Sequence, residues 1–127
     1  MNFSDRLAEQ IRLKNNPTVM GLDPKLEYIP ASIMEKYFCL DADPFKAAAD
    51  SILEFNKRLI DATFDIIPAV KPQLAYYEMY GPEGLRALYE TISYAREKGL
   101  LVIADGKRND IGSTAEAYAA AYLVEQI

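Results

Sequence analysis

Residues 100–107 read LLVIADGK, an apolar run that ends in a carboxylate and an ammonium group. Apolar residues on both faces predict a strand over 100–104 that is covered on both sides, as in a parallel sheet. The segment before it is helical in pattern from Pro82 and closes on Lys98-Gly99, the order typical of a helix C-terminus. An alanine-rich helix is expected to start near Ser113 or Thr114. A strand between two helices indicates an α/β fold.

The same order is found upstream. An amphipathic helix is predicted over 3–14, followed by a short buried strand over 18–22. Asp43-Pro44 is a helix-start signal, and the apolar spacing after it predicts a helix over 44–63 with one buried face. A second apolar strand is expected over 66–70, although Pro68 cannot donate a ladder hydrogen bond. Residues 23–43 are interpreted as a long connection.

This arrangement is one helix followed by three strand–helix units, which predicts a parallel sheet with helices outside it. Three parallel strands make an incomplete sheet. The last helical pattern still runs at Ile127 without a cap or a glycine, so we expect the chain to be part of a larger α/β domain that occupies residues 1–127 and continues further. A flavodoxin-like sheet completed elsewhere is the alternative fold.

Composition excludes several classes of function. The chain has 127 residues and a formal net charge of −5, which argues against a general nucleic-acid binder. It has no histidine, so histidine-dependent catalysis and histidine-ligated zinc are excluded unless another chain supplies the residue. Cys39 is the single cysteine, in an apolar flank, and is interpreted as a packed thiol in a cytosolic protein. No signal peptide or membrane-spanning run is found.

Each predicted strand ends in a charge: Asp23 after the first, Lys71 after the second, and Asp105 with Lys107 after the third. Ligands of α/β folds bind at the carboxyl ends of the strands. Either residue could instead have a purely structural role: Asp23 could stabilise a turn, and Lys71 could extend its ammonium into solvent from a strand end. Asp105 and Lys107 are two residues apart and should face the same, interior side. They form either an ion pair that closes the strand or a dry, charged substrate site.

Residues 105–114, DGKRNDIGST, resemble the Asp-x-Lys-x-x-Asp signature of the orotidine 5′-phosphate decarboxylase family. Residues 21–24 (GLDP) and 70–73 (VKPQ) match its longer bacterial branch, in the same order and spacing over essentially all 127 residues. Gly106 stands where that branch has alanine. The resemblance implies a (β/α)8, or TIM, barrel, of which this chain holds about three βα units at the N-terminal end; such barrels take about 250 residues.

The resemblance also implies the reaction, conversion of orotidine 5′-monophosphate (OMP) to UMP and CO2 in de novo pyrimidine biosynthesis. Lys107 matches the lysine that protonates C6 of the pyrimidine. Asp105 matches the carboxylate beside the substrate carboxylate, and Lys71 the other lysine of the charged array. Asp110 matches the aspartate lent to the neighbouring subunit of a homodimer. The fixed ammonium would stabilise charge on carbon and then supply the proton, so no metal or organic cofactor is expected.

The substrate-binding residues implied by the resemblance are Asp23 and Lys71 at the ribose, Thr114 lent across the dimer interface, and Ile111. The family's phosphate-binding arginine and closing loop match nothing in this chain. Remote phosphate contacts usually supply binding energy for the transition state. We therefore expect the 127-residue chain alone to be inactive or nearly so.

Two alternatives stay open at this point. A magnesium-dependent sugar-phosphate decarboxylase or hexulose-phosphate synthase of the same superfamily shares the signature but carries an acidic residue where Lys71 stands, and a cation does not ligate a metal. A non-catalytic barrel fragment would instead associate with itself or with a complementary half-barrel through its exposed strand edges.

Overall fold

The computed structural model describes residues 1–123, and its centre is a parallel sheet of three strands in the order β1-β2-β3. The strands are β1 (Val19–Leu22), β2 (Ala69–Pro72) and β3 (Leu101–Val102). Val19 lies opposite Ala69, which in turn lies opposite Leu101. The parallel α/β arrangement predicted from the sequence is confirmed, and all three carboxyl ends point the same way.

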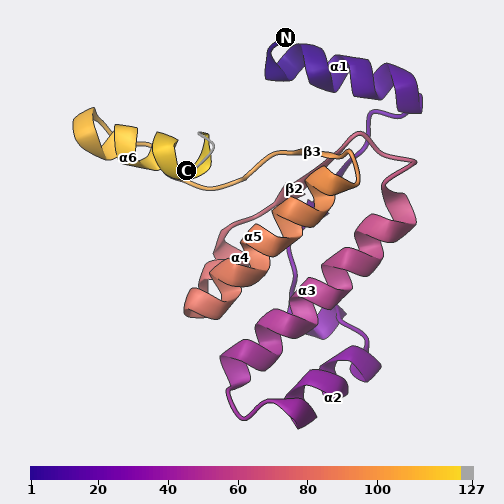
Figure 1. The fold of residues 1–127 in the computed structure, drawn as a ribbon, viewed down its shortest axis with the longest axis vertical. Coiled ribbons are helices and arrows are strands. Elements are labelled where there is room, and N and C mark those ends of the chain that lie inside the picture. The colour runs from indigo at the N-terminus through magenta and orange to yellow at the C-terminus, as the bar shows by residue number, and fades with distance from the viewer. Residues whose placement is uncertain (124–127) are drawn as a thin grey trace.

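Helices connect and cover the strands (Figure 1). The two longest lie side by side over the sheet, and α1 lies beyond the end at which the strands begin. The last helix, α6, extends away from this body. The helical elements are α1 (Phe3–Lys14), the short 3-10 helix η1 (Leu26–Tyr28), α2 (Ala31–Leu40), α3 (Pro44–Thr63), α4 (Ala75–Glu78), α5 (Gly81–Glu97) and α6 (Gly112–Tyr122).

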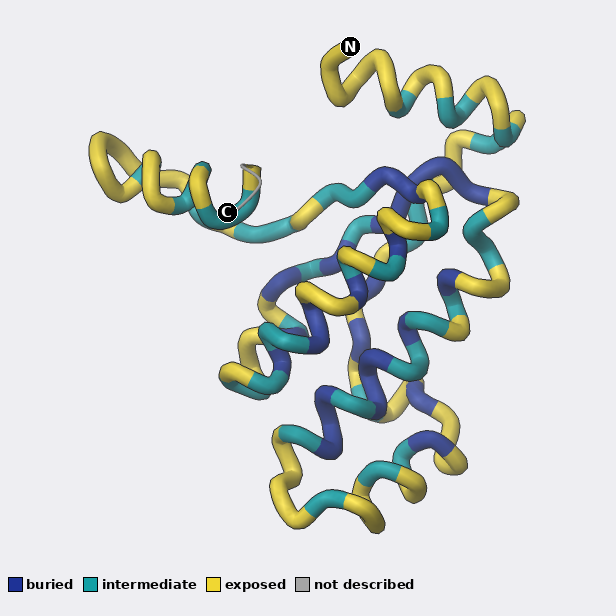
Figure 2. The backbone as a smooth tube through the Cα atoms, in the orientation of Figure 1, coloured by how far each residue is buried: buried dark blue, intermediate teal, exposed yellow. Residues whose placement is uncertain are grey.

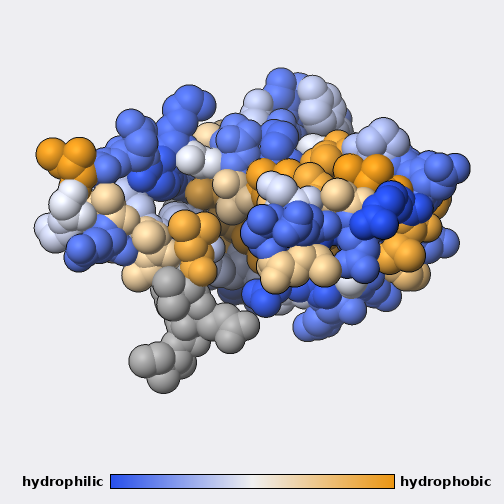
Figure 3. All heavy atoms as spheres, turned by 90° about the horizontal axis from the view of Figure 1, so that it is seen from above, coloured by the Kyte–Doolittle hydropathy of each residue, from blue (hydrophilic) through white to orange (hydrophobic). Residues whose placement is uncertain are grey.

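The core lies between the sheet and the facing sides of α3 and α5, where buried backbone is concentrated (Figure 2). One cluster joins Leu22, Ile60 and Val70 near the strands. A second joins Ile52 of α3 and Leu88 of α5 with other side chains. Neither α1 nor α6 contains a buried residue. On the face seen from above, apolar side chains remain visible among hydrophilic ones (Figure 3).

The prediction of a long connection over 23–43 is wrong, because this segment contains η1 and the ten-residue helix α2. The prolines misled this interpretation: Pro30 is the N-cap residue of α2 and so starts a helix. Ile33 of α2 is buried against the second core cluster. The prediction that Cys39 is a packed thiol is also wrong. Cys39 is exposed, because it lies on the side of α2 away from that cluster.

The second strand begins later than predicted. Residues 64–66 form a turn after α3, and β2 starts at Ala69, directly after Pro68. Proline has no N–H to give to a ladder, but its carbonyl can accept, and Pro68 O accepts from Leu101 N at 3.1 Å. β3 is shorter than the predicted 100–104, although Ile103 N still donates to Val70 O. The predicted helical continuation to Ile127 lies outside the described residues.

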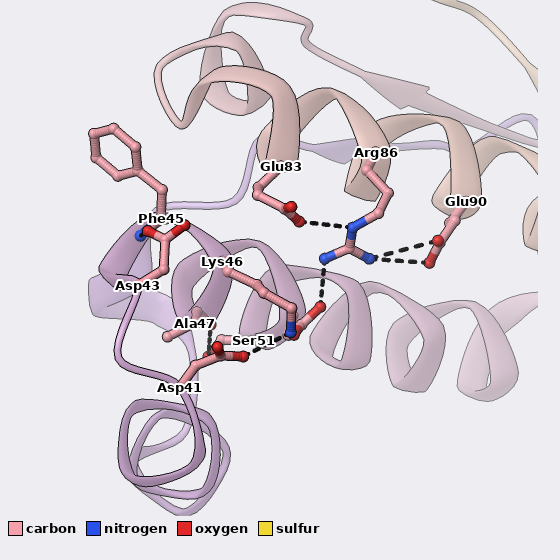
Figure 4. Close-up of polar contacts among 10 residues, drawn as sticks. Asp41, Asp43, Phe45, Lys46, Ala47, Ser51, Glu83, Arg86 and Glu90 are labelled. Carbon is pink, nitrogen blue, oxygen red and sulfur yellow. Dashed lines mark hydrogen bonds and ion pairs between the residues drawn. The ribbon is translucent and has the colours of Figure 1, made fainter.

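A network of charged side chains joins α3 to α5 and to the turn before α3 (Figure 4). Arg86 of α5 binds Asp50 of α3 at 2.5 Å. Lys46 joins the same Asp50, at 2.9 Å, to Asp41, at 2.6 Å. Burial alone would raise the pKa of Asp50, but the hydrogen bonds from Lys46 and Arg86 outweigh it and lower that pKa below the ordinary 3.8.

Asp50 should therefore stabilise the fold in a pH-dependent way. Its contribution is present above the ordinary carboxyl pKa and is lost as the pH falls through the lowered folded value. We expect Asp50→Asn to lower the free energy of unfolding by about 1 kcal/mol near neutral pH and by much less near pH ~2. Urea denaturation at both pH values measures this, with Asp65→Asn as the matched control. An equal loss at both pH values would contradict the prediction.

Candidate functional site

The predicted site residues lie at the carboxyl edge of the sheet because of the strand register. Gly21 of β1 lies opposite Lys71 of β2, and Asp23 follows two residues later. Beyond β3, Asp105 forms a bridge with Gln73, and Asp105 N donates to Pro72 O at 3.0 Å. The parallel ladder thus brings three segments that are distant in the chain to one edge.

Lys71 and Asp105 form the centre of this edge. Lys71 Nζ lies 2.9 Å from Asp105 Oδ2, and Gln73 Nε2 donates to the same oxygen at 3.1 Å. The hydrogen bond from Lys71 lowers the pKa of Asp105, and the charge of Lys107 lowers it further. In the same way the hydrogen bond to Asp105 raises the pKa of Lys71, with a smaller contribution from the charge of Asp23. Both residues of the pair are therefore charged near neutral pH.

These electrostatic links give the site alternating signs in the order Asp23, Lys71, Asp105, Lys107. Lys107 is exposed and lines a cavity of about 370 Å³ between the loop after β3 and α6. An ammonium at the edge of a cavity, with a carboxylate fixed nearby, can stabilise and protonate a developing carbanion.

The expectation of a dry interior around Asp105 is wrong for this chain. The side chains of Lys71 and Asp105 are 37% and 38% exposed. Burial decreases along the apolar run of residues 100–104, from buried Leu101 to exposed Ala104. Water therefore reaches the ion pair, and screening reduces its energy to that of a surface pair.

The residues expected to reach a neighbouring subunit are exposed on the segment that follows Lys107. Asp110 is exposed and accepts a hydrogen bond from the backbone N–H of Ile111 at 2.8 Å. Ile111 is 85% exposed, and Thr114 is exposed in the first turn of α6. Within residues 1–123, no hydrogen bond or ion pair joins Asp110 to Lys107. The structure thus presents these three side chains outward.

Sequence reasoning assigned no role to three residues that support the site. Gln73 binds Asp105, and its position two residues after Lys71 was the available signal. Arg108, next to Lys107, forms an ion pair with Glu78 of α4 and lies over the ring of Tyr118, 6.0 Å from its centroid. These contacts hold the loop after β3 against α4 and α6.

The third is Tyr77, which is fully buried. Its hydroxyl donates to Leu22 O at 3.1 Å, at the end of β1. Asn56 of α3 donates to that hydroxyl at 3.0 Å and to Thr91 Oγ1 of α5 at 3.2 Å. Burial raises the pKa of Tyr77, so the hydroxyl stays neutral and able to donate. The network fixes the end of β1 just before Asp23.

Tyr77→Phe should remove this support. We expect the free energy of unfolding to fall by about 1–2 kcal/mol, because the Leu22 carbonyl and the Asn56 amide each lose a buried partner. Urea denaturation measures this, with exposed Tyr89→Phe as the matched control. Equal free energies of unfolding for the two variants would show that the buried hydrogen bonds make no net contribution to stability.

Solved structures show which architecture this chain shares. Leishmania donovani OMP decarboxylase aligns with a TM-score of 0.69 and 32% identity over 95% of this chain and 39% of that one. Such neighbours are (β/α)8 barrels, so the chain has the fold of the amino-terminal part of that barrel, with its charges at the carboxyl ends of the strands.

Sequence comparison identifies the family. A sequence model described as "Orotidine 5'-phosphate decarboxylase / HUMPS family" matches residues 30–126, and the chain belongs to this family. Proteins named orotidine 5'-phosphate decarboxylase from Rhodopirellula baltica and Caldicellulosiruptor saccharolyticus are 45% and 38% identical to it. The alignments cover 97% and 98% of this chain, which spans only 40% and 41% of those relatives.

Among residues 1–123, no three His, Cys, Asp or Glu side chains are grouped so that they could hold a metal ion. In the same part of the chain, no helix is both long and apolar enough to cross a membrane.

Proposed function

We propose that the chain carries the charged residues of an orotidine 5′-phosphate decarboxylase, which converts OMP to UMP and CO2 in pyrimidine biosynthesis. The observation that supports this most is the Lys71–Asp105 pair with Lys107 and Asp23 on either side of it. Two acidic and two basic groups at one strand edge suit a substrate that is anionic before the reaction and develops charge on carbon during it.

In the proposed reaction the bond between C6 and the carboxylate breaks, and its electron pair stays on C6. The ammonium of Lys107 stabilises that charge and transfers a proton to C6, while CO2 leaves. Lys107 then regains a proton from water. Asp105 lies beside the substrate carboxylate, and Lys71 fixes Asp105 while reaching toward the ribose. No step requires a metal or an organic cofactor.

Substrate binding is proposed to involve both copies of a cytoplasmic homodimer. Asp23 binds a ribose hydroxyl within its own copy. Asp110, Ile111 and Thr114 reach the site of the second copy, which agrees with their exposure in their own copy. We further propose that residues 1–127 are a partial barrel that needs the later strands, and the phosphate contacts they hold, for turnover.

The magnesium-dependent alternative from the same family is disfavoured by Lys71, because an ammonium that is hydrogen-bonded to Asp105 occupies the place of a metal-ligating carboxylate. A chimera tests the choice: residues 1–127 replace the matched 40% of the Rhodopirellula baltica relative. We expect it to decarboxylate OMP at the same rate with and without a chelator. Loss of activity with the chelator, restored by magnesium, would favour the alternative.

A further inference from the structure

We propose that Gln73 is a positioning residue that holds the carboxylate of Asp105 in a fixed orientation together with Lys71. This inference deepens the proposed function and rests on it, because Asp105 is the carboxylate assigned to the substrate. The main evidence for this role is that both donors bind the same oxygen: Lys71 Nζ lies 2.9 Å and Gln73 Nε2 lies 3.1 Å from Asp105 Oδ2.

The backbone places Gln73 for this role. Gln73 and Asp105 are bridge partners, so their side chains are neighbours on one face of the ladder. Gln73 N also donates to Leu22 O at 3.4 Å, and Leu74 N donates to Asp105 O at 2.9 Å. The residue is thus held from both sides, by β1 and by the segment after β3, while its side chain is half-buried.

A second donor is needed because the ion pair alone is weak. With both side chains more than a third exposed, water competes for Asp105, and a lysine ammonium on a flexible stem fixes a position only loosely. An ionised carboxylate is purely an acceptor, so the amide NH₂ of Gln73 must face it. Two donors on Oδ2 restrict rotation of the carboxylate and leave Oδ1 directed elsewhere.

The neutrality of glutamine also matters. Asp23, Lys71, Asp105 and Lys107 already balance two negative charges against two positive ones. An amide adds a hydrogen bond without changing that balance, whereas a glutamate at position 73 would place a second carboxylate against Asp105 and raise its pKa. Gln73 therefore orients the carboxylate and keeps the alternation of signs intact.

Nuclear magnetic resonance on the isotope-labelled 127-residue chain tests this without substrate. The side-chain amide of Gln73 should shift with the same pH midpoint as the Asp105 carboxyl carbon, and Asp105→Asn should abolish that shift. Gln10 in α1 is the internal control, and its amide should not follow the midpoint. Gln73→Met keeps the length and bulk of the side chain without the donor, and should raise the measured Asp105 pKa by about half to one unit. Gln73→Glu should raise it further.

The outcomes separate this inference from the proposed function. If the Gln73 amide ignores the Asp105 midpoint, and Gln73→Met folds with the Asp105 pKa unchanged, the positioning role is overturned whatever the activity. If the amide follows Asp105 but the chimera cannot decarboxylate OMP, the positioning role stands and the assignment of Asp105 to that reaction fails.

Discussion

Lys107→Ala in the chimera should lower kcat for OMP decarboxylation by about 10³-fold or more, with a much smaller effect on KM. Losing the proton donor costs about 10²- to 10⁴-fold by general acid catalysis alone, and the fixed positive charge opposite the carbanion is lost with it. A steady-state assay that follows absorbance gives both constants.

The matched control is Lys36→Ala, which removes an exposed lysine of α2 that pairs with Glu54 and with none of the charged residues at the strand ends. This variant should keep the activity of the parent chimera. A Lys107→Ala chimera that retains more than about a tenth of the parent kcat would remove Lys107 from the role of proton donor.

Gly84→Ala should destabilise the fold strongly, because a Cβ added there comes closer to other atoms than a Cβ added at any other glycine among residues 1–123. Gly84 lies in the first turns of α5, where a Cβ would overlap the backbone carbonyl oxygen of Tyr77 in α4 and lie 2.9 Å from its carbonyl carbon. Backbone atoms cannot swing aside as a side chain can. We expect the free energy of unfolding to fall by about 3 kcal/mol and Tm by about 10 °C.

Gly21→Ala is the matched control for that variant. A Cβ at Gly21 would meet only the Asp23 side chain, at 3.8 Å, which is ordinary van der Waals contact. The Tm of Gly84→Ala should therefore lie below the Tm of Gly21→Ala by most of the expected decrease of about 10 °C. Equal Tm values would mean that α4 and α5 can separate at no cost, against the close contact that the structure shows between them.

The fold was predictable where one local signal agreed with the packing. The helix over 44–63 was placed correctly, because Asp43 caps it through Phe45 N at 2.9 Å and its apolar face packs on α5. Helix α2 escaped prediction because its cap is a proline without a side-chain acceptor, so no polar start signal marked it. The start of β2 at Ala69 was not predictable, because it is set by pairing with β3, about 30 residues further along the chain, and residues 66–70 alone do not show where that pairing begins.

Some features of the site could likewise be predicted from the sequence, and others could not. Charges at three strand ends could be recognised in the sequence because parallel strands share a carboxyl edge, and Lys71 and Asp105 do meet there. Their exposure could not be predicted, because it depends on what covers the edge and not on the strand itself. The contribution of Gln73 and the link from Tyr77 to Leu22 depend on side-chain directions that only the assembled elements define.

The first measurement to make is the rate of OMP decarboxylation by the chimera, beside the 127-residue chain alone and the remaining 60% of the relative alone. We expect saturable turnover by the chimera, and none by either part. A chimera that folds and binds UMP but does not decarboxylate OMP would contradict the claim that residues 1–127 carry the catalytic charges. Saturable turnover by the 127-residue chain alone would contradict the claim that it is a partial barrel.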